Sequence, residues 1–143
     1  MALNFANNNS LSAITTKPSG LSGGSMNLIS TQTASSSSTI SFTSGIDDSY
    51  DEYVFKFYNI HPATNNTEFQ FNMSTDSGSN YNVTKTTTMF NANHNEAGSS
   101  TGLTYDTNAD IAQGTGYKLL AGACGADADQ AVSGNLFIFN PSS

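Results

Sequence analysis

The chain has 143 residues and a formal charge of −7, and only 10 % of its side chains are charged. Serine, threonine and asparagine supply 55 residues, a composition that favours strands and turns over helices. Four lysines and no arginine exclude the clustered cations that nucleic acids and anionic membranes require, so neither is an expected partner. The length predicts one domain with a core, and the lone cysteine, Cys124, rules out an intrachain disulfide.

Residues 1–25 are polar, with isolated hydrophobic residues at spacings that fit neither a helix nor a strand. One interpretation is a flexible leader. The other, which we favour, is an extended arm that inserts its hydrophobic side chains into a neighbouring subunit, because apolar groups are unfavourable in water. The assembly candidates in this arm are Leu3, Phe5, Leu11 and Ile14. The start of the sequence, MALNFANNNS, does not resemble a signal peptide, so we expect synthesis in a cytoplasm without secretory export.

Strand patterns follow the arm. The first half contains runs with β-compatible composition or alternating polarity. These expected strands are residues 26–33, 39–44, 53–60, 68–74 and 81–90. The last three are separated by polar turns, which predicts a three-stranded antiparallel meander over residues 53–90. The first strand of this meander is apolar on both faces, which predicts a central position in its sheet.

The second half is less regular. Residues 91–107 are polar and predict a loop, 117–121 a short strand and 122–134 an acidic loop of small residues. Residues 135–140 predict a final strand that is apolar on both faces and therefore central. Seven or eight short strands without a helix indicate an all-β fold, an antiparallel β-sandwich or jelly roll that forms a single domain over residues 26–143.

Neither nucleophilic catalysis nor metal binding has a clear signature. His61 precedes a proline and His94 lies in a polar segment, so no serine or cysteine has an evident base. Cys124 lies among small residues, as a semi-buried hydrophobic residue would. Residues 47–52 and 106–111 carry carboxylates suited to a divalent cation, but neither has the spacing of a calcium loop. We expect no catalytic, cofactor-binding or metal-binding residues and no enzymatic activity.

Five motifs share a resemblance to one protein family. They are LSAIT (11–15), ISFTSGIDDSYDEYVF (40–55), NIHPAT (59–64), STDSGSNYNVTKTTT (74–88) and FNPSS (139–143). With them the chain resembles virion structural proteins of marine tailed phages, including phages of cyanobacteria. The resemblance implies a non-enzymatic particle component and supplies no catalytic or metal-binding residue. Members of that family commonly continue past the FNPSS motif, which implies that a C-terminal segment is missing from this sequence.

Three functions are therefore considered. The first is a structural component of a tailed-phage virion, assembled with other virion proteins in several copies, as a trimer or symmetric ring, on the tail (as a fibre or tail-attached protein) or on the head surface. The second is a host-glycan-binding module, in which exposed tyrosine rings stack on sugars. Its candidate residues are Tyr50, Tyr53, Tyr58, Tyr81, Tyr105 and Tyr117. The third is a depolymerase of the host envelope that acts through loop carboxylates.

Overall fold

The computed structural model describes residues 26–141, and the chain divides into two units, Met1–Thr31 and Gln32–Ser143. The described residues contain no helix, and every strand lies in the second unit, which confirms the predicted all-β fold. The strands are β1 (Glu52–Ile60), β2 (Thr67–Phe71), β3 (Lys85–Thr87), β4 (Phe90–His94), β5 (Thr101–Tyr105), β6 (Ile111–Gly114), β7 (Lys118–Cys124) and β8 (Val132–Phe139). The predicted arm and its assembly candidates Leu3, Phe5, Leu11 and Ile14 lie outside the described residues.

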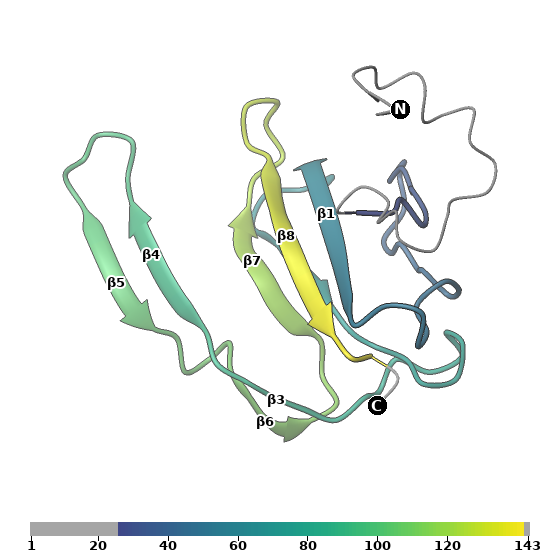
Figure 1. The fold of residues 1–143 in the computed structure, drawn as a ribbon. Coiled ribbons are helices and arrows are strands. Elements are labelled where there is room, and N and C mark those ends of the chain that lie inside the picture. The colour runs from purple at the N-terminus through teal and green to yellow at the C-terminus, as the bar shows by residue number, and fades with distance from the viewer. Residues whose placement is uncertain (1–25, 142–143) are drawn as a thin grey trace, which may run out of the picture. The chain divides into compact units, whose positions relative to one another are not determined.

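The strands pair in a nested order. β1 pairs with β8, β2 with β7, β3 with β6 and β4 with β5, always antiparallel, so that four two-stranded ribbons form (Figure 1). The predicted meander is therefore wrong, because β1 and β2 each pair with a strand from the end of the chain. The predicted central positions of β1 and β8 are also wrong among the described residues, since each strand is paired along one side only. Alternating polarity specifies which face of a strand is buried and does not specify its neighbour.

The ribbon of β1 and β8 carries most of the aromatic core. Tyr53, Phe55 and Phe57 face one side of β1, and their partners across the ladder are Ile138, Leu136 and Gly134. Tyr53 is 4 % exposed. A Cβ atom at Gly134 would lie 2.8 Å from the Phe57 ring, so glycine is required for the ring to lie over the strand. We call this side of the ribbon the inner face.

Aromatic contacts join the inner face to its neighbours. The Phe57 ring meets the Phe69 ring of β2 edge to face, with centroids 5.0 Å apart. Phe42 makes a similar contact with Phe55 at 5.4 Å. The segment around Phe42 was predicted as a strand, as was 26–33, but no strand occurs between residues 26 and 51. Phe42 packs as expected there, whereas Ile40 is exposed and the backbone does not join a ladder.

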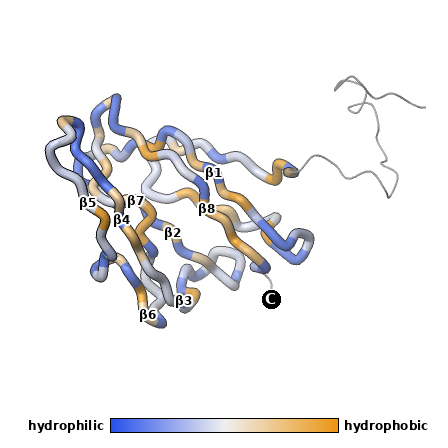
Figure 2. Tube along the Cα trace, turned by 60° about the vertical axis from the view of Figure 1, so that its left-hand side comes forward, coloured by the Kyte–Doolittle hydropathy of each residue, from blue (hydrophilic) through white to orange (hydrophobic). Residues whose placement is uncertain are grey.

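The ribbon of β4 and β5 was predicted as a loop, and that prediction is wrong. Cross-strand pairs put Phe90 beside Tyr105 and Ala92 beside Leu103 on one face, while asparagine and threonine side chains occupy the other. The apolar face has no cover among the described residues: Phe90 is 70 % and Leu103 78 % exposed. Figure 2 shows hydrophobic stretches in this hairpin and along β8. An isolated two-stranded hairpin is marginally stable, so the exposed face requires a partner element.

Polar side chains hold the ribbons together where apolar packing is sparse. The Asn72 side chain, just after β2, donates from Nδ2 to the Thr115 carbonyl at 3.0 Å. The buried Lys85 ammonium of β3 donates to the next carbonyl, that of Gly116, at 2.7 Å. Burial lowers the pKa of Lys85, because desolvation disfavours its charged form. Both side chains thereby fix the turn between β6 and β7, which precedes Lys118.

Candidate binding site

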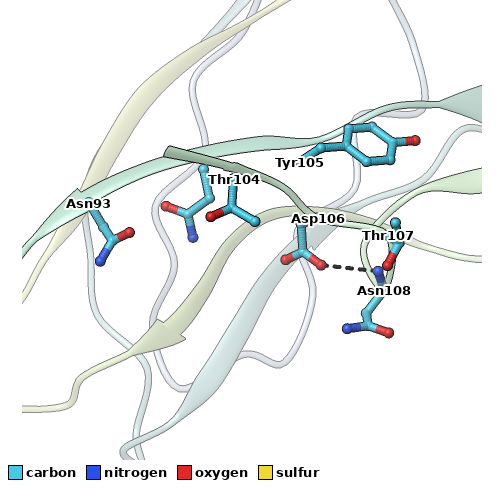
Figure 3. Close-up of a pocket in the computed structure, with 7 residues that line it drawn as sticks. Asn93, Thr104, Tyr105, Asp106, Thr107 and Asn108 are labelled. Carbon is cyan, nitrogen blue, oxygen red and sulfur yellow. Dashed lines mark hydrogen bonds between the residues drawn. The ribbon is translucent and has the colours of Figure 1, made fainter. Parts of the chain in front are cut away.

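The loop Asp106–Asp110 joins β5 to β6 and borders two hollows of the described surface. Its first residue closes it: the Asp106 carboxylate accepts a hydrogen bond from the Asn108 amide at 3.0 Å, shown as the dashed line in Figure 3. The Ala109 amide donates to the Asp106 carbonyl at 3.3 Å, and the Asp106 amide donates to Met89 at 2.9 Å. Aspartate is favoured at such positions because its short side chain bonds the backbone two residues on. We call this segment the 106–110 loop.

Two side chains outside the turn fix the other end of the 106–110 loop. Lys118 of β7 is buried, and its ammonium donates to the Ala109 carbonyl at 2.7 Å. The Tyr105 hydroxyl donates to the Asp110 carboxylate at 2.5 Å. This hydrogen bond, followed by desolvation and the negative charge of Asp110, raises the pKa of Tyr105. The loop is thus held at both ends before any ligand binds.

One hollow, of about 390 Å³, lies on the polar face of the β4–β5 hairpin. Its lining residues are Asn91, Asn93, Thr104, Tyr105, Asp106, Thr107 and Asn108. In Figure 3 the side chains of Asn93, Thr104 and Asp106 gather on one side of the hairpin, while the Tyr105 ring points away. Amides, hydroxyls and one carboxylate offer many hydrogen-bond donors and acceptors without a cation.

A second hollow, of about 200 Å³, shares Asp106 and Asn108 with the first and continues toward β2 and β7. Tyr117, which is 51 % exposed, supplies an aromatic ring there. Beside it Gln70 donates to Glu68 at 2.6 Å, so these two side chains are already oriented. An open ring face beside fixed acceptors suits a ligand that carries both apolar C–H surface and hydroxyl groups.

Three carboxylates of the two segments considered for a cation accept hydrogen bonds within the chain. In the 106–110 loop, Asp106 accepts from Asn108 and Asp110 from Tyr105. In the 47–52 segment, hydrogen bonds from Ser49 and Tyr53 hold the pKa of Asp47 below its ordinary value. Within residues 26–141, no group of three or more His, Cys, Asp and Glu side chains is arranged to hold a metal ion. These aspartates shape turns.

The candidate nucleophiles and bases do not converge in the described contacts. His61 bonds the Asn59 side chain at 2.9 Å, and His94 bonds the Asn95 carbonyl at 2.9 Å. Cys124 is buried, with Sγ 3.6 Å from the Ala121 carbonyl. The expected lack of catalytic residues stays a prediction, since no measurement of activity bears on it.

Of the six tyrosines proposed as sugar platforms, the structure brings Tyr105 and Tyr117 to the 106–110 loop. Tyr53 is buried and bonds Asp47, so it is unsuited to stacking. Sequence analysis missed Lys118 and Gln70. Neither carries a recognisable signal, because the partner of Lys118 is a backbone carbonyl and Gln70 occupies an ordinary outward position of a strand.

Comparisons of the chain with protein-family models, curated proteins and solved structures give no match. The resemblance to phage virion proteins therefore stays a prediction. Among the residues that the structure describes, no helix has the length and apolar character needed to cross a bilayer.

Proposed function

We propose that this protein is a structural, non-enzymatic component of a tailed-phage virion, present in several copies on the tail or the head surface. One observation carries the proposal: among residues 26–141, eight strands pair in nested order, and their ribbons leave apolar faces that no described residue covers. A protein that functions as an isolated monomer rarely exposes such faces. The resemblance of the sequence motifs to virion proteins of marine tailed phages supports the choice of a phage particle.

The nested order also supports a jelly-roll architecture. A jelly roll is a long antiparallel ribbon, in which the first strand pairs with the last and each inner pair follows in turn, wound into two packed sheets; the pairing seen here is that of such a ribbon. Curling would bring the β4–β5 apolar face against the rest of the core and join the two-stranded ribbons into two packed sheets. Jelly rolls are common in viral capsid and lectin domains.

The test is mass spectrometry of purified particles of the phage that encodes the chain, combined with particle imaging after labelling of the protein. We expect the protein in particles at a fixed ratio to the major capsid protein, at symmetry-related positions. Its absence from particles, together with a monomeric state of the free protein at high concentration, would contradict the proposal.

A second candidate function is recognition of host glycans on the particle surface. The hollow that combines the exposed Tyr117 ring with Glu68, Gln70 and the 106–110 loop favours it. A glycan array identifies a ligand, and titration of that ligand then compares Tyr117→Ala with Tyr117→Phe. We expect the alanine variant to lose about tenfold or more in affinity and the phenylalanine variant, which keeps the ring, to lose little. An array without hits removes this candidate.

A further inference from the structure

The second side of the β1–β8 ribbon differs from the inner face in that nothing described covers it. Because side chains alternate along a strand, the residues between Tyr53, Phe55 and Phe57 point the opposite way. Val54 lies across the ladder from Phe137, and Glu52 lies across from Phe139. We call this side the outer face. Its members used here are Glu52, Val54, Lys56, Tyr58, Phe137 and Phe139.

Three aromatic side chains dominate the outer face. Phe137 is 51 %, Phe139 64 % and Tyr58 69 % exposed. A buried aromatic side chain covers 150–250 Å², so these exposures leave about 350 Å² of aromatic surface in water on each copy. A patch of this size on one face of a small protein is typical of an interaction surface.

The charges on the outer face favour one kind of partner. Lys85 and Lys118 are buried on backbone carbonyls, so Lys56 is the one exposed lysine among residues 26–141. Lys56 lies two positions after Val54, and Glu52 lies two positions before Val54. All three are on the same side of the strand. The described structure contains no ion pair for either. A carboxylate and an ammonium thus flank an apolar centre at equal spacing.

This spacing is self-complementary. A two-fold axis that lies between the two facing ribbons, perpendicular to the strands and level with Val54, places the second copy so that each Glu52 meets the Lys56 of the other chain. The two contacts are identical, as in every two-fold interface. A partner of different sequence would have to match this pattern independently, whereas a second copy matches it by symmetry. The strongly acidic chain otherwise repels itself, which makes the placement of its exposed lysine on this face informative.

We propose that the outer face of β1–β8 binds a second copy of this chain, with a two-fold axis level with Val54. Val54 and Phe137 then meet their own copies at the apolar centre, and paired Glu52–Lys56 contacts lie at either side. The inference rests on the proposed role in a multi-copy assembly and deepens it by naming the surface, the partner and the symmetry. Two outer faces with their polar rims bury on the order of 1,000 Å², the lower limit of a specific interface, so the dimer is reversible.

The experiment measures the mass of the full chain by sedimentation equilibrium over a wide concentration range. The wild type is expected to pass from monomer to dimer. Lys56→Glu places four carboxylates at the interface and Glu52→Lys four ammonium groups, and each is expected to raise the dimer Kd about tenfold or more. Glu96→Lys, in the β4–β5 turn, makes the same charge change as Glu52→Lys and is expected to leave the Kd unchanged.

Two recombinations make the test specific to the two-fold arrangement. The double variant Glu52→Lys/Lys56→Glu exchanges both charges and restores the pairing, so its Kd is expected to return to near the wild-type value. An equimolar mixture of the two single variants is expected to form a heterodimer at concentrations at which each variant alone is largely monomeric. Circular dichroism and thermal melts of each variant separate a loss of association from a loss of folding.

The possible results decide between occupants. A wild type that stays monomeric at every concentration overturns the proposal. A dimer whose Kd is unchanged by Lys56→Glu and Glu52→Lys also overturns it. A dimer that is lost only when residues 1–25 are deleted overturns it too, and assigns the contact to that segment. A protein found in particles but monomeric when free leaves the proposed function standing and overturns this inference. If the free protein dimerises with the predicted charge dependence but is absent from particles, this inference stands and the proposed function is overturned.

Discussion

Replacing Tyr53 by phenylalanine tests whether the acidic segment before β1 is a structural device. The Tyr53 ring is buried in the inner face, and its hydroxyl reaches three atoms of Asp47, all at 3.1 Å: the amide nitrogen, the carbonyl oxygen and the carboxylate Oδ1. Tyr53→Phe keeps the ring and removes only this hydroxyl. The Asp47 amide then loses its acceptor, and the carboxylate loses one of its donors.

The expected loss follows from the type of hydrogen bond. A hydrogen bond of a buried hydroxyl contributes about 0.5–1.5 kcal/mol, and the Tyr53 hydroxyl has more than one partner, so we expect Tyr53→Phe to lower the free energy of unfolding by about 1–2 kcal/mol. For a domain of this size the melting temperature falls by about 3–6 °C. Urea denaturation followed by tyrosine fluorescence measures the free energy. Tyr117→Phe, at an exposed ring, is the control and should change it by less than about 0.5 kcal/mol.

The pH dependence separates the hydrogen bond from packing. The folded-state pKa of Asp47 is depressed, so the stability linked to its ionisation is present above the ordinary aspartate value near 3.9 and is lost as pH falls through the lower folded value. The difference between wild type and Tyr53→Phe should therefore narrow below about pH 4. A difference that stays constant from pH 7 to pH 3, or a loss no larger than that of the control, refutes this account of the 47–52 segment.

Three further perturbations follow from the same geometry. Hydrogen bonds from Ser74 and Asn80 lower the pKa of Asp76 to about 2, so Asp76 should stabilise the 74–80 turn only while it is ionised. Asp76→Asn should therefore lower the melting temperature at pH 7. The difference in melting temperature from the wild type should close between about pH 4 and pH 2. Gly134→Ala should destabilise the chain by about 1–3 kcal/mol in urea titrations, because the added methyl group meets the Phe57 ring; a neutral result would show that the ring is free to move. The pKa of Tyr105 is raised in the folded state, so its contribution to stability is complete below pH 10 and is lost as pH rises through the folded value. Asp110→Asn should shift the absorbance titration of Tyr105 to lower pH. An unchanged titration would contradict the Tyr105–Asp110 hydrogen bond.

The elements that could be predicted from sequence are those with strong alternation of large apolar residues. β1, β2 and β8 were located within a few residues, because aromatic side chains recur at every second position. β4 and β5 were missed, since their outward positions hold Asn91, Asn93 and Thr104, residues typical of loops. Residues 39–44 were predicted as a strand and are not one: Phe42 packs on Phe55, but the backbone of this segment pairs with no strand.

The strand pairing and the candidate binding site were harder to predict from the sequence. Nothing in the sequence of β1 indicates that its partner is the last strand, because cross-strand preference between apolar residues is weak. The sequence has carboxylates at residues 106–111 without the spacing of a calcium loop, and it does not reveal that Asp106 and Asp110 accept bonds from Asn108 and Tyr105. Lys118 is the clearest omission. Lysine is seldom buried, and its ammonium is satisfied by the Ala109 carbonyl, a partner that only the folded chain brings near.

The nested pairing also sets the order in which the chain can fold. The β4–β5 hairpin closes a short turn, with His94 beside Thr101, and each ribbon outside it must close a longer loop than the one before. If the ribbons pair in order from the β4–β5 turn outward, β1 pairs with β8 last. During synthesis on the ribosome the aromatic strand β1 therefore stays unpaired until its partner β8, which ends at Phe139, has been made. Slow formation and a need for protection against aggregation are expected for such a long-range closure, which makes the newly made chain a natural client of chaperones.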